Sequence, residues 1–185
     1  MFAVFENAGV MDTRLLTTLG TNVKENESPI GFFGTGMKLA LAVCARLGYP
    51  VFVEFGDGHR WELCVDASEV RGKEFNFLKL VHTTGTRYIS LPFTTEFGKN
   101  WEPWMVLREF ESNMRDENGA LRYYGTMSDH DERYVASVVP PPKRGVVRFI
   151  VGGEFAAECE EYRRHTFFDK VAQCIYSDDR VDIAM

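Results

Sequence analysis

The chain lacks several features that would place it in a membrane or a secretory pathway. No apolar run approaches the ~20 residues that a bilayer-spanning helix needs, and there is no internal repeat or low-complexity segment. The N-terminus, MFAVFENAGV, has no basic segment before its apolar stretch, so it does not predict a signal peptide. We therefore expect a protein that is not in a membrane and works in the cytoplasm.

Positive charge is also scarce. The chain carries 21 Lys and Arg against 27 Asp and Glu, a formal net charge of −6. This balance argues against a nucleic-acid binder that works through a basic face, whereas a basic protein partner would be attracted. The four cysteines contain no Cys-x-x-Cys pair, which excludes a zinc ribbon and favours a reducing compartment. No Gly-x-Ser-x-Gly motif of a serine hydrolase is present.

What the chain does have is enough apolar material for one folded domain. It has 185 residues, of which 45% are hydrophobic and 14% aromatic. Intrinsic disorder is therefore excluded for most of the chain, and its length predicts a single domain over 1–185.

The pattern of apolar residues predicts an α+β fold. We expect long helices over 34–48 and 101–117, because both stretches have apolar residues at helical spacing. The stop at Gly48 before Tyr49-Pro50 supports the first of them. A mostly antiparallel sheet with helices on one face is expected from the remaining elements. These are a short helix at 12–19 with Asp12 as its cap, a helix at 154–165, and strands at 2–5, 50–55, 60–65, 75–81, 86–93, 134–139 and 145–151.

A glycine-rich loop precedes the first long helix. Residues 30–38 read IGFFGTGMK, so that Gly31, Gly34 and Gly36 stand directly before the apolar helical run. Glycines let the backbone approach a ligand closely, and the free N–H groups of a helix start attract phosphate. A close helix contact that needs small residues is the alternative explanation of the same pattern.

The second long helix carries polar residues beside its apolar face. At about 100° per residue, Glu109, Asn113 and Asp116 fall within an arc of roughly 60°. The Asn113 side chain can supply a hard oxygen ligand to a metal bound to phosphate. Glu109 can position and deprotonate a water that attacks phosphorus. An ordinary solvated acidic helix has the same spacing and remains an alternative.

Four motifs together resemble the GHKL ATPases, which include gyrase B, MutL-type mismatch-repair proteins, heat-shock chaperones and histidine kinases. They are ENAGVMD at 6–12, the glycine loop at 30–38, the sequence TGT at 84–86, and a Glu-x-x-x-Asn-x-x-Asp helix at 109–116. That helix opens the family's fold but comes last here, as in a circular permutation and as in similar viral and prophage proteins. The resemblance covers 6–117, with 134–185 completing strands and a C-terminal helix. It implies a permuted two-layer α/β sandwich of the Bergerat type, with a mixed, mostly antiparallel sheet.

The resemblance also implies roles for individual residues. Glu109 would be the general base, Asn113 would coordinate Mg²⁺, and Asp116 would support the adenine side. Thr86 would contact the adenine side as well, and Glu6 stands where the family has its adenine-reading Asp. Asp12 is the alternative reader, because Ala8 and Val10 replace the glycines of that motif. The phosphates would be bound by Gly31, Gly34, Thr35, Gly36, Lys24 and Lys38, with a helix-surface position as the alternative for Lys38.

The function implied is Mg²⁺-dependent ATP binding with slow hydrolysis. A lid over 17–33 would close on the nucleotide and control a surface for a protein partner. A cytoplasmic location follows, in the bacterial host if the protein is viral. Two alternatives remain: a non-catalytic nucleotide-binding or protein-interaction module on the same fold, such as a viral accessory protein, and a structural α+β domain whose motifs match by chance.

Overall fold

A computed structural model describes residues 1–19, 35–125 and 135–159, and all structural statements below concern these residues. The elements are β1 (Phe2–Ala8), α1 (Arg14–Thr17), α2 (Gly36–Leu47), β2 (Val51–Asp57), β3 (Arg60–Val70), β4 (Lys73–His82), β5 (Tyr88–Thr94), α3 (Pro103–Asp116), β6 (Ala120–Tyr124), α4 (Val135–Val138) and β7 (Arg144–Gly152). Residues 154–159 are also helical.

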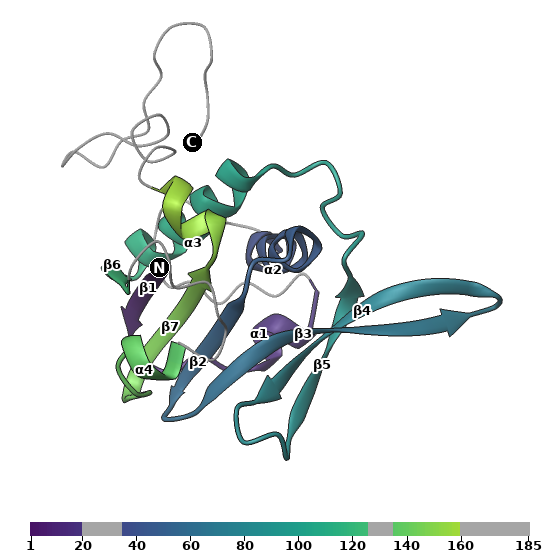
Figure 1. Ribbon diagram of the computed structural model, residues 1–185. Coiled ribbons are helices and arrows are strands. Elements are labelled where there is room, and N and C mark those ends of the chain that lie inside the picture. The colour runs from purple at the N-terminus through teal and green to yellow at the C-terminus, as the bar shows by residue number, and fades with distance from the viewer. Residues whose placement is uncertain (20–34, 126–134, 160–185) are drawn as a thin grey trace, which may run out of the picture.

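The strands form one seven-stranded sheet in the order β5-β4-β3-β2-β7-β1-β6 (Figure 1). Every pair of neighbouring strands in it is antiparallel, so the expected α+β class is confirmed while the expected mixed sheet is not. β7 is the last of the described strands in the chain but lies between β1 and β2. The N-terminal strand therefore pairs only with strands that follow it by more than half of the chain.

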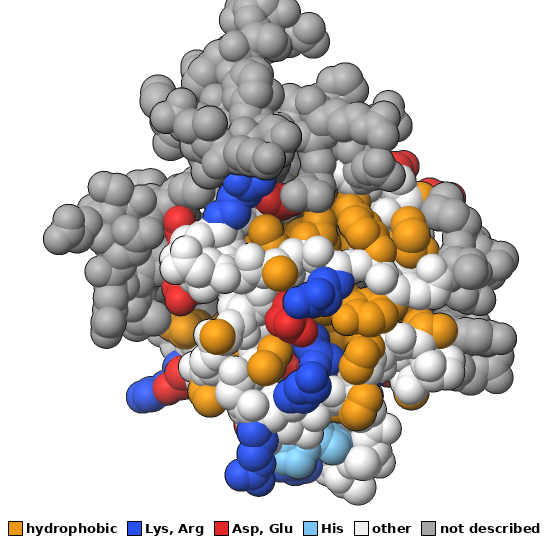
Figure 2. Space-filling model, turned by 90° about the vertical axis from the view of Figure 1, so that its left-hand side faces the viewer, with side chains coloured by type: hydrophobic (Ala, Val, Ile, Leu, Met, Phe, Trp, Pro, Cys, Tyr) orange, Lys and Arg blue, Asp and Glu red, His pale blue; other side chains and the backbone are white. Residues whose placement is uncertain are grey.

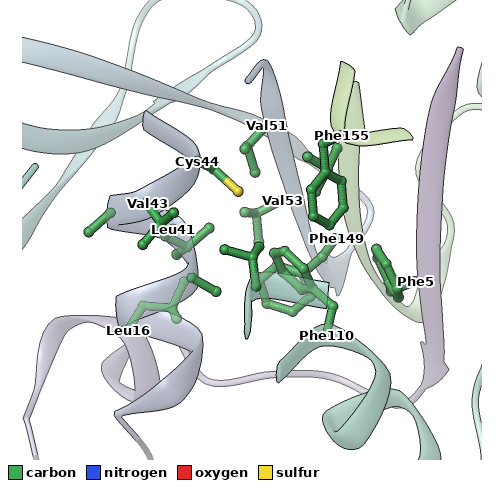
Figure 3. Close-up of a cluster of buried hydrophobic side chains, with 14 of the residues drawn as sticks. Phe5, Leu16, Leu41, Val43, Cys44, Val51, Val53, Phe110, Phe149 and Phe155 are labelled. Carbon is green, nitrogen blue, oxygen red and sulfur yellow. The ribbon is translucent and has the colours of Figure 1, made fainter. Parts of the chain in front are cut away.

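Helices α2 and α3 pack side by side against one face of the sheet (Figure 1). The apolar side of α3 turns inward as its spacing predicts, with Val106, Leu107, Phe110 and Met114 buried. Phe110 stacks on Phe5 of β1, with ring centroids 5.0 Å apart, and lies 5.6 Å from the ring of Phe149. Figure 3 shows this aromatic cluster beside the aliphatic side chains of α2. The core thus joins both long helices to the centre of the sheet.

The opposite face of the sheet is partly covered by the segment around α4. Val135 and Val139 pack there on Phe2, Val4, Phe52 and Ile150. The predicted strand at 134–139 is therefore wrong, and so is the placement of all helices on one face, because α4 lies on this second face. Residues four apart share one side of a helix, which lets a single turn bury Val135 and Val139 together. Pro140, Pro141 and Pro142 follow at once and cannot extend it.

The other predicted elements differ from the structure mainly at their ends. The helices over 34–48 and 101–117 are confirmed as α2 and α3. Gly48 ends α2 in the left-handed conformation with φ 73°, as expected for a glycine stop. α1 is shorter than predicted and its N-cap is Thr13. The strand β6 was not predicted.

Candidate functional site

The α2–α3 contact brings two of the sequence motifs together. Gly36, the first residue of α2, lies directly against the carboxylate of Glu109 on α3, and a Cβ at position 36 would overlap Oε2 and Cδ of that side chain. A side chain at position 36 would therefore displace this carboxylate, which is the end of a flexible side chain. The close-contact explanation of this glycine is therefore correct, and its neighbour is the predicted catalytic residue.

Gly36→Ala is expected to lower the free energy of unfolding by about 1 kcal/mol, at the low end of overpacking costs, because the methyl group displaces only the carboxylate end of the flexible Glu109 side chain. Helix propensity alone predicts the opposite sign, a gain of up to about 1 kcal/mol. Urea denaturation followed by tryptophan fluorescence measures the change. Adding Glu109→Asp, which shortens the side chain by one methylene, should recover part of the loss. A Gly36→Ala protein as stable as the wild type would contradict the contact.

Asn113 lies one turn after Glu109 and is held in a defined orientation. Its Nδ2 donates to the backbone oxygen of Glu109 at 2.7 Å, and Ser112 Oγ donates to the same oxygen at 3.1 Å. A carbonyl oxygen can accept only from the nitrogen end of the amide, so Oδ1 of Asn113 is directed elsewhere. That oxygen is the atom that a metal ion would use. Asp116, half-buried, is the last residue of the same helix.

Arg108 completes this side of α3, and sequence reasoning missed it. Its Nη2 lies 3.3 Å from Glu109 Oε1. Its guanidinium carbon lies 5.8 Å from the ring centre of Trp101 and 5.9 Å from that of Trp104, within the range of cation–π attraction. The spacing offered a partial signal, since residues 104 and 108 share one side of α3, whereas Trp101 lies just before the helix. A positive charge is thus held beside the candidate base.

The start of α2 is suited to an anion. Thr35 is its N-cap without a side-chain cap, and the first turn contains no acidic residue. The N–H groups at a helix start favour negative charge, which Glu109 supplies from α3. Lys38, two residues further on, is fully buried, which excludes the helix-surface alternative, and burial lowers its pKa from 10.5. Gly31, Gly34, Lys24 and most of the predicted lid over 17–33 lie outside the described residues.

Glu6 lies on the opposite face of the sheet from Glu109. It alternates along β1 with Phe5 and shares the side of Val4, which faces α4. Its Oε2 lies 3.0 Å from Arg148 Nε on β7, and its Oε1 lies 3.7 Å from Arg122 Nε on β6. The structure therefore does not bring Glu6 together with the residues at the α2–α3 contact.

Glu6 belongs to a row of four charged residues across four adjacent strands. Arg148 contacts Glu54 with Nη1 and Oε2 3.3 Å apart, and Arg60 contacts Glu54 with Nε and Oε1 2.7 Å apart. Their order Glu6–Arg148–Glu54–Arg60 alternates in sign, and we call them the charge ladder. Arg148 and Arg60 also donate to the backbone oxygen of Pro140, at 2.9 and 2.7 Å. The ladder thus fastens the segment around α4 to the sheet.

The two remaining predicted nucleotide contacts are exposed and lie elsewhere in the fold. Thr86 is in the turn between β4 and β5, with Oγ1 3.2 Å from Thr84 Oγ1, which in turn lies 2.7 Å from His82 Nδ1. Asp12 accepts a hydrogen bond from the backbone N–H of Arg14 at 2.8 Å and pairs with its guanidinium, which lowers the Asp12 pKa to about 2. Within the described residues, no recorded contact joins either one to Glu109.

The described part of the surface on the side that bears β6 carries charges of both signs (Figure 2). Figure 2 shows that side with basic and acidic side chains next to one another among hydrophobic ones. In the parts of the chain that the structure describes, no group of three or more His, Cys, Asp and Glu is placed to hold a metal ion. The same parts contain no helix long and apolar enough to span a bilayer.

Comparison with known proteins gives no relative from which a function could be inferred. No protein-family model, no curated protein and no solved structure matches it. The site is therefore defined by the residues around the α2–α3 contact. Those that the structure brings together are Gly36, Glu109 and Asn113, with Thr35 and Arg108 beside them.

Proposed function

We propose that the protein binds ATP with Mg²⁺ where α2 begins beside α3, hydrolyses it slowly, and uses the bound nucleotide to control a surface for a protein partner. The observation that carries this proposal is the contact between Gly36 and Glu109. It joins a glycine-rich helix start, which suits phosphate, to a carboxylate that can act on water. The permuted Bergerat-type fold is part of the same proposal.

The residues present fit a magnesium ion that is held mostly by phosphate and water. Mg²⁺ usually takes only one or two protein ligands at a nucleotide site, so a cluster of carboxylates is not required. Oδ1 of Asn113 would be the protein ligand, and the ion would supply positive charge against the phosphate oxygens. Glu109 would orient the attacking water and accept its proton. The first turn of α2 would bind phosphate oxygens through backbone N–H groups.

A second candidate function is nucleotide or protein binding without catalysis. It is favoured by the position of Glu6, which pairs with Arg148 on the far face of the sheet. On this alternative the base is recognised by other groups and the bound state, not its turnover, serves the partner. If the module binds a nucleotide, the two candidates agree on binding and differ on phosphate release.

Thermal unfolding with and without Mg-ATP tests the binding step. Ligand at 100 times its Kd should stabilise the wild type by about 2.7 kcal/mol. Asn113→Ala should lose the part of this shift that depends on Mg²⁺ and retain a weaker shift with ATP alone. Asn100→Ala, at an exposed position before α3, serves as the matched control and should behave as the wild type. If no nucleotide changes the unfolding temperature of the wild type, both nucleotide-binding candidates are overturned and only the protein-binding module is left.

A further inference from the structure

The hairpin of β3 and β4 projects beyond the body of the sheet as an arm (Figure 1). β2 pairs with β3 only as far as Glu62, opposite Phe52. From Leu63 to Val70, β3 pairs with β4 on one side and with no described strand on the other. Val65 and Val70 on this stretch are 47% and 46% exposed. A two-stranded hairpin is at best marginally stable in water, so a third strand would stabilise the arm.

The two outer strands of the described sheet, β5 and β6, are better protected against pairing than this edge, whose only charged residues are Asp66 and Glu69. β5 carries Pro92, and its pairing with β4 is interrupted by a register shift between Phe77 and Lys79. β6 is only five residues long and carries Arg122. By contrast, β3 from Leu63 to Val70 has no proline and no basic residue, and its register with β4 is continuous. Long edges without such devices pair readily with another strand.

The turn of the hairpin determines which backbone groups face outward. Arg71 and Gly72 both have positive φ, 55° and 79°, which is the type I′ geometry of a two-residue turn. In such a hairpin the flanking residues Val70 and Lys73 form a hydrogen-bonded pair, and bonded and non-bonded pairs alternate from there. The N–H and C=O groups that point away from β4 therefore belong to Leu63, Val65, Ala67 and Glu69.

The charges of the arm suit a second copy of the same chain. Residues 63–79 contain three acidic and three basic side chains and are neutral, so the net charge of −6 lies elsewhere in the chain. A strongly basic or acidic partner would gain little from such an arm. An antiparallel pair of identical β3 edges centred on Ala67 places Val65 opposite Glu69 of the second copy, and Asp66 opposite Ser68. A centre on Asp66 or Glu69 would place like charges opposite each other.

We infer that the protein forms a two-fold symmetric dimer in which the β3 edges of two copies pair antiparallel around Ala67. The outward N–H and C=O groups of Val65, Ala67 and Glu69 bond to those of the second copy, and the two sheets become continuous. This inference does not depend on nucleotide binding.

Sedimentation equilibrium of the full chain tests it, with a concentration-dependent dimer expected for the wild type. Val65→Glu puts a carboxylate opposite Glu69 of the other copy at two symmetric places, which should raise the dimer Kd about tenfold or more. Adding Glu69→Lys in the same chain makes both pairs attractive and should restore the dimer. Val65→Gln, matched in size and neutral, should have a much smaller effect than Val65→Glu.

Ala67→Pro provides an independent variant, because it removes an outward N–H and leaves the hydrogen-bonded pairs with β4 unchanged. It should abolish the dimer, while circular dichroism of the monomer stays that of the wild type. A wild type that is monomeric at every concentration overturns the inference and leaves a strand of another protein as the occupant. A dimer that Val65→Glu and Ala67→Pro both leave intact overturns it as well.

Discussion

Glu109→Gln is expected to lower the rate of phosphate release by about 10²–10⁴-fold while ATP still stabilises the protein. Glutamine has nearly the same shape but cannot accept a proton from water. The substitution should leave the contact with Gly36 in place, because the amide fills the space of the carboxylate. The measurement is steady-state phosphate release under excess Mg-ATP, with thermal unfolding of the same samples to establish binding.

Glu117→Gln is the matched control, since Glu117 is exposed at the end of α3 and away from Gly36. It should hydrolyse ATP at the wild-type rate. If Glu109→Gln releases phosphate at the wild-type rate, Glu109 is not the general base. A wild type that is stabilised by ATP but releases no phosphate would favour the non-catalytic module.

Arg148→Met should cost about 3–5 kcal/mol of unfolding free energy, the largest loss of stability that we expect from one substitution. Arg148 is 2% exposed and contacts both Glu6 and Glu54. Without it, the buried Glu54 keeps only one cationic neighbour, Arg60, and the backbone oxygen of Pro140 loses a donor. Urea denaturation, with its midpoint and slope compared to those of the wild type, gives the size of the effect.

Arg122→Met is the control for this experiment. Arg122 also faces Glu6, at 3.7 Å, but it is largely exposed, so its removal should cost less than about 1 kcal/mol. The difference between the two variants isolates the effect of burial from that of charge. A loss near 1 kcal/mol for Arg148→Met would contradict the stabilising role of the charge ladder.

The elements that the sequence predicted well are those that a local pattern specifies. The apolar spacing in α2 and α3 and the glycine stop at 48 are properties of a few consecutive turns, and both helices are confirmed. The proximity of Gly36 and Glu109 could be expected only through the family resemblance. The Glu109 carboxylate lies where a side chain of residue 36 would be, and this contact depends on how α2 and α3 cross.

The features that the sequence did not predict depend on distant strands. The sequence predicts that the first strand ends at residue 5, and the family resemblance implies that Glu6 lies on the adenine side of a nucleotide site. Pairing with β6 and β7 on both sides extends β1 to Ala8 and turns Glu6 away from the helices. The burial of Arg148 and Glu54 is equally non-local, because each charge is tolerated only beside the other. The valines of residues 135–139 favour a strand by intrinsic propensity, but packing on the second face of the sheet makes this segment the helical turn α4.

The place of β7 between β1 and β2 has a consequence for how the protein folds during synthesis. The meander of β2 to β5 contains only contacts between neighbours in sequence and can form as soon as it leaves the ribosome. β1 is made first but acquires its partners only when residues 120–152 have been translated. Until then the apolar strand β1 is unpaired, and an unpaired apolar strand is prone to aggregation. The rate-limiting event of folding should thus be the insertion of β7 between β2 and β1, which joins the β2–β5 meander to the β1–β6 pair.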